Sequence, residues 1–135
     1  MAMIKKIIIV EGISDKKRVE EVLNDHVHII CTHGTMGVEK MDELLEEIYG
    51  SQVYVLVDQD KEGKKIRKWF KKYASESQHI YIDSTFSEVA RCPRQYLANV
   101  LNYHGFIVKN DFVLKGKYRY HETHRNIERY IQAFW

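Results

Sequence analysis

The amino-acid sequence predicts an α/β fold with a mainly parallel central sheet and helices on both faces. Short, apolar, β-branched segments recur along the chain, which is typical of buried strands. Segments with apolar residues at helical spacing separate them, and this alternation favours parallel strands joined by helical crossovers. The chain has 135 residues, of which 44% are hydrophobic and 30% are charged, so its size and composition fit one globular domain with a substantial core.

The first half of the chain contains three of the predicted strands and two helices. The strands are expected at residues 4–10, 27–32 and 52–57. Ser14 is expected to cap the helix after the first strand, because its hydroxyl oxygen can accept a hydrogen bond from a free N–H group of the first turn. A second helix is expected over residues 38–49, where apolar residues share one face, and Gly50 ends it.

The second half continues the same alternation. A helix over residues 61–73 carries four large apolar or aromatic side chains at helical spacing, and a fourth strand is expected at residues 79–82. Pro93 suits the first turn of a helix over residues 93–103, because proline lacks the N–H group that this position leaves unused.

The C-terminal part of the sequence is expected to complete the same domain. It begins with a short strand at residues 106–108 and ends in a helix whose inner face carries Ile127, Tyr130, Ile131 and Phe134. We therefore predict a domain over residues 1–105 and a basic, aromatic C-terminal extension, residues 106–135, packed on the same domain.

Cysteine content and hydropathy indicate a cytoplasmic protein. Cys31 and Cys92 are too few for a disulfide framework and lack metal-ligand spacing, so both are expected to be reduced thiols. No apolar run approaches the ~20 residues that span a bilayer. The apolar run near the N-terminus is also too short for a signal peptide. We therefore expect no membrane partner.

Acidic residues follow the first and third predicted strands. Glu11 comes directly after the first strand, and Asp58 and Asp60 come directly after the third. Parallel strands end at one edge of a sheet, so these three carboxylates converge if the two strands are neighbours. Clustered carboxylates repel one another, and a hard cation such as Mg²⁺ between them makes the arrangement stable. Gly12 and Gly63 are expected to let the backbone turn sharply beside the acids. The alternative is that Asp60 only caps the next helix and Glu11 is an ordinary loop acid.

The two segments that carry these acids resemble a known domain. "IIIVEGISD" and the later "VYVLVDQDKEG" resemble the two signatures of the Toprim domain, a Glu after the first strand and an Asp-x-Asp after the third. This domain is shared by bacterial primases, type IA and type II topoisomerases, nucleases, recombination mediators and the ribonuclease that matures 5S ribosomal RNA. The resemblance covers about residues 4–90 and implies a Rossmann-like Toprim fold.

The resemblance also implies roles for the acids. Asp58 and Asp60 would hold Mg²⁺, for which Mn²⁺ could substitute, and Glu62 would be an auxiliary ligand. Glu11 would be the general acid or base, or a further metal ligand. Glu88 would add a carboxylate for a second metal, although a surface acid at this position needs no function.

Two further positions match the family's pattern in the loops. Asp15 falls on the acid of a Glu-Gly-x-x-Asp pattern, and a first-turn helix acid explains it equally well. Gly34 resembles the glycine in the loop after the family's second strand.

Basic residues are concentrated in the second part of the chain. The net charge is +2, yet residues 1–57 hold 6 Lys/Arg against 10 Asp/Glu, and residues 58–135 hold 15 against 9. The helix expected over residues 61–73 contains Lys61, Lys64, Lys65, Arg67, Lys68, Lys71 and Lys72. A solvated helix face is the default interpretation of its lysines, and sequence-independent contact with phosphates is the functional one. Arg119 lies in the C-terminal extension, where basic and tyrosine residues suit single-stranded or looped RNA unless they only complete the fold.

Together these features predict a small Mg²⁺-dependent nuclease. Topoisomerases and primases of this family need further catalytic domains for which a chain of this size has no room. Hydrolysis of a phosphodiester bond remains, with RNA favoured over DNA and processing of ribosomal RNA as the expected setting. Recognition of the substrate is then expected from the C-terminal extension, from a homodimer or from a protein partner.

Two alternatives come from different functional classes. The first is a non-catalytic adaptor that binds nucleic acid or assembles complexes, as in recombination mediators. The second is a receiver-like domain in which Asp58 accepts a phosphoryl group, which is disfavoured because receivers usually have paired Asp residues after their first strand.

Overall fold

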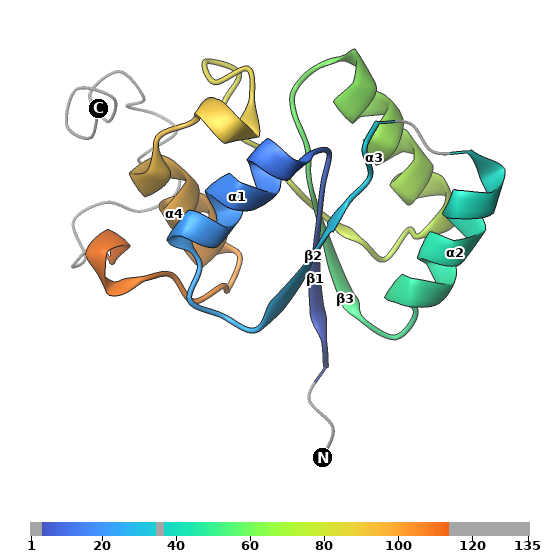
Figure 1. The fold of residues 1–135 in the computed structure, drawn as a ribbon, viewed down its shortest axis with the longest axis horizontal. Coiled ribbons are helices and arrows are strands. Elements are labelled where there is room, and N and C mark those ends of the chain that lie inside the picture. The colour runs from blue at the N-terminus through green and yellow to red at the C-terminus, as the bar shows by residue number, and fades with distance from the viewer. Residues whose placement is uncertain (1–3, 35–36, 114–135) are drawn as a thin grey trace.

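A four-stranded parallel sheet forms the centre of the protein (Figure 1). The structure, a computed structural model, describes residues 4–34 and 37–113. The strands are β1 (Lys6–Val10), β2 (Val27–Cys31), β3 (Gln52–Leu56) and β4 (Gln78–Ile80). Their order in the sheet is β2-β1-β3-β4, and all three pairings are parallel, so the predicted fold class is confirmed.

The two strands that lead into the acids are direct neighbours. β1 pairs with β3 from Lys6 opposite Gln52 to Ile9 opposite Val55. Because the strands are parallel and in this register, both carboxyl ends reach the same edge of the sheet. The condition that the sequence left open is therefore met.

Helices cover both faces of the sheet (Figure 1). Helices α1 (Ile13–Val22) and α4 (Arg94–Tyr103) lie on one side, and α2 (Val38–Ile48) and α3 (Lys61–Tyr73) lie on the other. Successive residues of a strand point to opposite faces, so β1 contributes to two cores. Ile8 and Val10 pack in the core that includes α1 and α4, whereas Ile7 and Ile9 pack in the core that includes α2 and α3. Within the described ranges, no helix is long and apolar enough to cross a membrane.

The start of α1 differs from the sequence prediction. The cap is Gly12 rather than Ser14, which lies inside the helix. The reason is the carboxylate of Asp15, whose Oδ2 accepts a hydrogen bond from the Gly12 N–H at 3.0 Å. An acid at the third helical position can satisfy the backbone of the cap residue in this way, so a serine hydroxyl is not required.

The segment after α4 also differs from the prediction. Residues 106–108 do not form a strand, and only Val108 makes an isolated antiparallel bridge, to Leu23. Phe106 and Val108 are nevertheless buried in the core on the side of α1 and α4. Two 3₁₀ turns, η1 (Val89–Arg91) and η2 (Asn110–Phe112), lie on either side of α4 in the chain. The predicted last helix and Arg119 lie outside the described residues.

Candidate functional site

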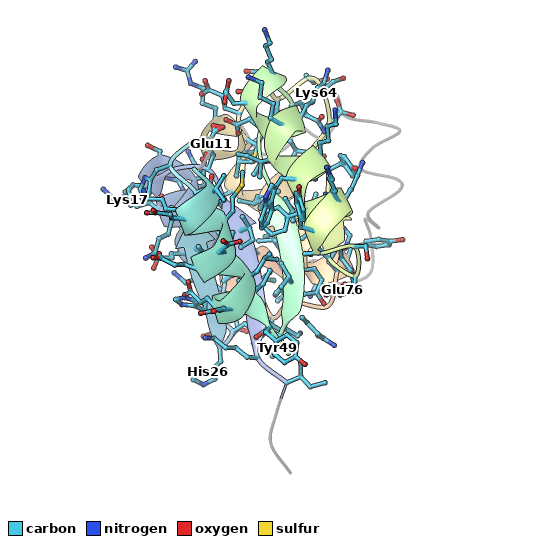
Figure 2. All side chains as sticks on the ribbon, turned by 90° about the vertical axis from the view of Figure 1, so that its right-hand side faces the viewer. Glu11, Lys17, His26, Tyr49, Lys64 and Glu76 are labelled. Atoms are coloured by element: carbon cyan, nitrogen blue, oxygen red, sulfur yellow. The ribbon has the colours of Figure 1, made fainter. Side chains whose placement is uncertain are left out.

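Three carboxylates meet at the carboxyl edge of the sheet. Glu11 follows β1, and Asp58 and Asp60 follow β3. One oxygen from each of the three side chains lies within 4.8 Å of the other two. Figure 2 shows Glu11 and Lys64 at the same end of the molecule, opposite the end where His26 and Tyr49 lie.

Burial and repulsion between neighbouring acids raise the pKa values of Glu11 and Asp58. Burial raises the pKa of Glu11 to about 7, and the negative charges of Asp60 and Asp58 add to the effect. Burial also raises the pKa of Asp58 to about 6, although a hydrogen bond from the Val89 N–H to Asp58 Oδ1 at 2.8 Å opposes this rise. Glu11 Oε1 is buried and has no hydrogen-bond partner among the residues that the structure describes. The edge of the sheet therefore concentrates negative charge that the described protein groups compensate only in part.

Asp60 caps α3 and also belongs to the acid group. Its Oδ1 accepts a hydrogen bond from the Gly63 N–H at 2.7 Å, which satisfies a free donor of the first turn. The capping role that the sequence offered as an alternative is thus real. It does not remove Asp60 from the acid group, because a carboxylate oxygen of Asp60 still lies within 4.8 Å of Glu11 and Asp58.

The acid group suits a hard divalent cation. All of its donors are carboxylate oxygens, the ligand type that Mg²⁺ prefers. A cation there would supply the partner that the buried Glu11 Oε1 lacks and would offset the repulsion that adds to the effect of burial on its pKa. The residues present therefore fit the predicted metal site, and Glu11, Asp58 and Asp60 are the side chains that could hold the ion.

Two side chains that the sequence analysis missed hold the strand end that carries Asp58. The pairing of β3 with β4 stops at Leu56 opposite Ile80. Beyond that point Arg67 Nη2 donates to the carbonyl oxygens of both Val57, at 3.2 Å, and Ile80, at 2.7 Å. Gln59 Nε2 donates to the carbonyl oxygen of Ile82 at 3.1 Å. Thus side-chain hydrogen bonds, in place of backbone hydrogen bonds between strands, hold the chain at the residues before and after Asp58.

Arg67 is buried, with 5% of its surface exposed, and does not belong to the basic surface of α3. The sequence could have indicated that Arg67 is buried. It lies next to Ile66 and three residues before Phe70, on the buried stripe of the helix. Gln59 lies between Asp58 and Asp60, whose side chains point the same way while the chain is extended. The side chain of Gln59 therefore points to the opposite side, away from the acids.

Asp15 ties α1 to the turn that covers Asp58. It accepts from the Gly12 N–H, and a second hydrogen bond, from the backbone of Ala90, also opposes the rise that burial causes in its pKa. Arg18 Nε and Nη2 donate to the Ala90 carbonyl oxygen at 3.0 and 2.8 Å. Ala90 follows Val89, whose N–H binds Asp58. Asp15 is thus a buried acid of the first helical turn that positions η1.

Glu62 and Glu88 lie outside the group of three acids. Glu62 Oε1 lies 3.5 Å from Lys65 Nζ, and Glu88 Oε2 lies 3.0 Å from Arg91 Nε. Their charges still act on the site, because Glu62 contributes to the raised pKa of Glu11 and Glu88 contributes to that of Asp58. Roles as metal ligands for these two residues stay predictions.

The three predicted loop glycines have different structural reasons. Gly63 lies inside the first turn of α3, and a Cβ atom there would lie 2.0 Å from the Asp58 carbonyl oxygen, so close approach explains it and a sharp turn does not. Gly12 has an extended backbone with φ of −136° that any residue can adopt, so the prediction of a special turn is wrong there. Gly34 has φ of 90°, in the left-handed region that favours glycine.

The lysines of α3 that were predicted to bind nucleic acid are exposed, unlike Arg67. This exposed set begins beside the acid group and comprises Lys61, Lys64, Lys65 and Lys68. Figure 2 shows Lys64 at the end of α3 near Glu11. Contact of these residues with phosphates stays a prediction, and Arg119 lies outside the described ranges.

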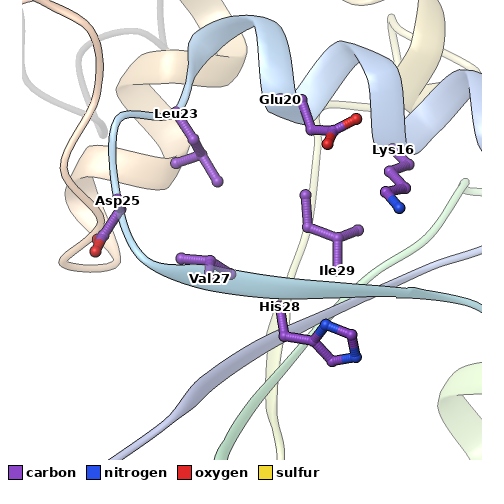
Figure 3. Close-up of a pocket in the computed structure, with 7 residues that line it drawn as sticks. All are labelled: Lys16, Glu20, Leu23, Asp25, Val27, His28 and Ile29. Carbon is purple, nitrogen blue, oxygen red and sulfur yellow. The ribbon is translucent and has the colours of Figure 1, made fainter. Parts of the chain in front are cut away.

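A pocket lies elsewhere, between α1 and the edge strand β2 (Figure 3). It has a volume of about 350 Å³. Lys16, Glu20, Leu23, Asp25, Val27, His28 and Ile29 line it. None of these is a member of the acid group, so the acids form an open edge rather than the wall of this pocket.

Comparisons with known proteins agree with the fold. The family model of the Toprim domain matches residues 6–85 of the sequence. The chain is 45% identical over 101 residues to the uncharacterized protein YusF of Bacillus subtilis, covering 75% of this chain and 69% of that protein. It is 30% identical over 115 residues to ribonuclease M5 of Borreliella burgdorferi, covering 82% of this chain and 62% of the relative.

A solved structure, that of a small TOPRIM domain protein from Bacillus stearothermophilus, superimposes with a TM-score of 0.78. The two sequences are 41% identical, and the match covers 86% of this chain and 98% of the other. The family match over more than half of the chain, the parallel sheet and the acids at the ends of β1 and β3 lead to one conclusion. The chain belongs to the Toprim domain family.

Proposed function

We propose that the protein is a metal-dependent enzyme that hydrolyses phosphodiester bonds in nucleic acid. The observation that carries the proposal is the acid group, because two separate strands bring Glu11, Asp58 and Asp60 within 4.8 Å of one another. Membership of the Toprim family supports a function on nucleic acid, and the similarity to a protein named ribonuclease M5 favours RNA over DNA. The chain spans 62% of that relative, so its complete activity, including any role in ribosomal RNA processing, is proposed here by analogy.

Mg²⁺ is the proposed cofactor, with Mn²⁺ as a substitute. Glu11, Asp58 and Asp60 would hold the ion, and Glu62 and Glu88 add negative charge around them. When bound, such an ion would polarise the scissile phosphate and lower the pKa of a water molecule. Glu11 has a second proposed role as general acid or base. Without the ion its pKa is about 7, near neutral pH, where an acid–base group transfers protons most effectively, and a bound ion would lower it.

The basic residues of α3 would position the substrate. They are exposed and begin beside the acid group, so they suit contacts with the phosphates on either side of the scissile bond. Such contacts do not depend on base sequence. They weaken as the salt concentration rises, because the release of counterions from the nucleic acid on binding is then less favourable. Cytoplasmic location, a homodimer and a protein partner stay predictions from the sequence.

A cleavage assay tests the catalytic proposal. Labelled structured RNA, single-stranded DNA and duplex DNA are incubated with the purified protein and Mg²⁺ or Mn²⁺. We expect Glu11→Gln and Asp58→Asn to lose at least ~100-fold in cleavage rate, because each removes a charge from the acid group. Asp42→Asn, a change of an exposed acid on α2, is the matched control and should cleave like the wild type. Cleavage that persists in both site variants would show that the activity comes from a contaminant.

A thermal titration tests the metal site independently of activity. An ion that binds only the folded protein raises the melting temperature as its concentration increases. We expect this rise with millimolar Mg²⁺ in the wild type and in Asp42→Asn, but not in Asp58→Asn. Binding of nucleic acid without cleavage and without a Mg²⁺ response would favour the adaptor instead. Family membership already argues against the receiver-like phospho-acceptor.

A further inference from the structure

Tyr81 presents an aromatic ring at the carboxyl end of the outer strand β4. It follows β4, the edge strand next to β3, and 41% of its surface is exposed. The next residue, Ile82, accepts the hydrogen bond from Gln59, and Gln59 lies between Asp58 and Asp60. The ring therefore belongs to the same edge of the sheet as the acids.

A buried cation holds the ring of Tyr81 in place. The Arg67 guanidinium carbon lies 4.1 Å from the ring centroid, and three carbonyl oxygens together with His79 Nδ1 fix the guanidinium group. The His79 ring stacks near Tyr81, with centroids 6.3 Å apart and planes 27° apart. An aromatic ring fixed in this way loses little conformational freedom when another flat group stacks on it.

Positive charge flanks this ring on α3. Lys64 and Lys71 lie three residues before and four residues after Arg67, so all three share one stripe of the helix. Both lysines are exposed. The pKa of His79, on β4, falls to about 4, mainly through burial, with further contributions from the charges of Arg67 and Lys71. This surface thus combines a fixed ring with two exposed lysines on the neighbouring helix.

We propose that Tyr81, with Lys64 and Lys71, forms a docking surface for a single-stranded polynucleotide that leads into the acid group. A base would stack on the exposed part of the Tyr81 ring, and the lysines would contact the adjoining phosphates. Single strands offer free base faces for such stacking, whereas the bases of a duplex already stack on one another. This inference rests on the proposed function, and it adds that the substrate near the site is unpaired.

Binding measurements on an inactive protein test this inference. The full chain with Glu11→Gln is titrated against fluorescent single-stranded RNA, single-stranded DNA and the matching duplexes. We expect Tyr81→Leu to weaken single-strand binding about tenfold, in line with the loss of one stacked base, and to leave duplex binding within twofold. Tyr81→Phe keeps the ring and should restore single-strand binding to within twofold. The RNA and DNA arms show which sugar is preferred.

The charge contribution has its own matched control. Lys64→Gln and Lys71→Gln should each weaken single-strand binding. Each should also make the negative slope of log affinity against log salt shallower by about 0.7. Lys17→Gln removes an exposed charge from α1 and should change neither quantity. Figure 2 shows Lys17 well away from Lys64.

The outcomes separate this inference from the proposed function. A protein that binds neither single strands nor duplexes would overturn both. Binding that Tyr81→Leu leaves unchanged, or weakens equally for single strands and duplexes, would overturn the inference alone. Photocrosslinking with 5-iodouridine oligonucleotides requires no change at Tyr81 and so does not depend on the stability of a variant. We expect the crosslink on the peptide that contains Tyr81, and a crosslink confined to other peptides would overturn the inference.

Discussion

At the residue scale, the geometry of the acid group depends on side chains that the acidic motifs do not contain. Arg67 fixes the carbonyl oxygen that precedes Asp58, Gln59 fixes the strand beyond β4, and the Val89 N–H holds Asp58 itself. Buried carboxylates of like charge would otherwise move apart. The supporting hydrogen bonds are therefore as much a part of the site as the acids are.

The first prediction concerns Arg67. Arg67→Met fits the same space but leaves the carbonyl oxygens of Val55, Val57 and Ile80 without their donor. We expect it to lower the free energy of unfolding by about 2–4 kcal/mol in urea titrations. Arg67→Lys should recover only part of this, because an ammonium group lacks the planar fork that reaches two strands.

An exposed arginine provides the control for this change. Arg91→Met removes a side chain that is 80% exposed, and its effect should stay within about 0.5 kcal/mol. Equal effects of Arg67→Met and Arg91→Met would mean that the buried hydrogen bonds contribute nothing.

The second prediction concerns pH and His79. Burial and the nearby Arg67 charge lower the pKa of His79 to about 4, below the ordinary value of 6.5. The folded state therefore favours the neutral ring, so this stability is present above pH 6.5 and is lost as the pH falls towards 4. His79→Gln keeps an acceptor for Arg67 but does not titrate. We expect the wild type to lose about 1–2 kcal/mol relative to this variant between pH 7 and pH 4.

The comparison with the variant is needed because Glu11 and Asp58 titrate in an overlapping range. The raised pKa values of these acids, about 7 and about 6, have the opposite sign of effect, since protonation favours their folded state. Unfolding free energies measured across the pH range should therefore be subtracted between the two proteins. Parallel curves for wild type and His79→Gln would contradict the prediction.

At the scale of secondary-structure elements, the contact between the start of α3 and the end of β3 decides the position of Asp58. Gly63 permits this contact, because a Cβ atom there would lie 2.0 Å from the Asp58 carbonyl oxygen. Alanine normally favours a helix over glycine by about 1 kcal/mol, so the third prediction sets propensity against packing. We expect packing to dominate, with Gly63→Ala less stable by about 1–3 kcal/mol and with a smaller Mg²⁺-induced rise in melting temperature.

Gly12 provides the matched control for this element. Its backbone is extended, and a Cβ atom there would meet only Asp15 Oδ2, at 3.8 Å. Gly12→Ala should therefore change stability by less than about 1 kcal/mol. A Gly63→Ala protein that is more stable than the wild type would show that α3 can shift without displacing Asp58.

Most elements could be predicted from the sequence, because their apolar residues either recur at helical spacing or form a short run typical of a buried strand. The exceptions have physical reasons. Ser14 has the right chemistry for a cap, but Asp15 caps the helix from within and moves its start to Ile13. Residues 106–108 are apolar like a strand, yet Phe106 and Val108 are buried in the core on the side of α1 and α4, and only Val108 makes a bridge, to Leu23.

At the scale of the whole molecule, charge is divided between two helices on the same side of the sheet. The sequence of α2, VEKMDELLEEI, has five acids and one lysine, whereas α3 is strongly basic. A polyanion would therefore be attracted to the side of α3 and repelled from that of α2. This division would also direct nucleic acid to the side where the docking surface at Tyr81 is proposed.

The fourth prediction follows from this division. A triple variant, Lys61→Gln with Lys65→Gln and Lys68→Gln, should weaken binding of single-stranded nucleic acid and reduce the slope of log affinity against log salt by about two. Lys40→Gln on α2 should leave the slope unchanged, because five acids surround it on that helix. Fluorescence anisotropy across a range of salt concentrations measures both. A slope that the triple variant retains would place the phosphate contacts elsewhere.

The convergence of the acids could be predicted only conditionally. The positions of Glu11, Asp58 and Asp60 at strand ends could be seen in the sequence, but the order β2-β1-β3-β4 that makes two of the strands neighbours could not. Periodicity predicts strands and does not predict their order. The supporting contacts of Arg67 and Val89 are less predictable still, because they join segments that the pattern of apolar residues does not connect.

The bridge between Leu23 and Val108 has a consequence for how the protein is made. Backbone hydrogen bonds on either side of it, from Asn24 to Ile107 and from Lys109 to Val22, tie the end of α1 to a segment synthesised much later. A ribosome releases the acids of both motifs long before it releases Phe106 and Val108, which close the core over α1. Since distant contacts form late and cooperatively, we expect the edge that carries the acid group to become rigid only after this closing segment has been released.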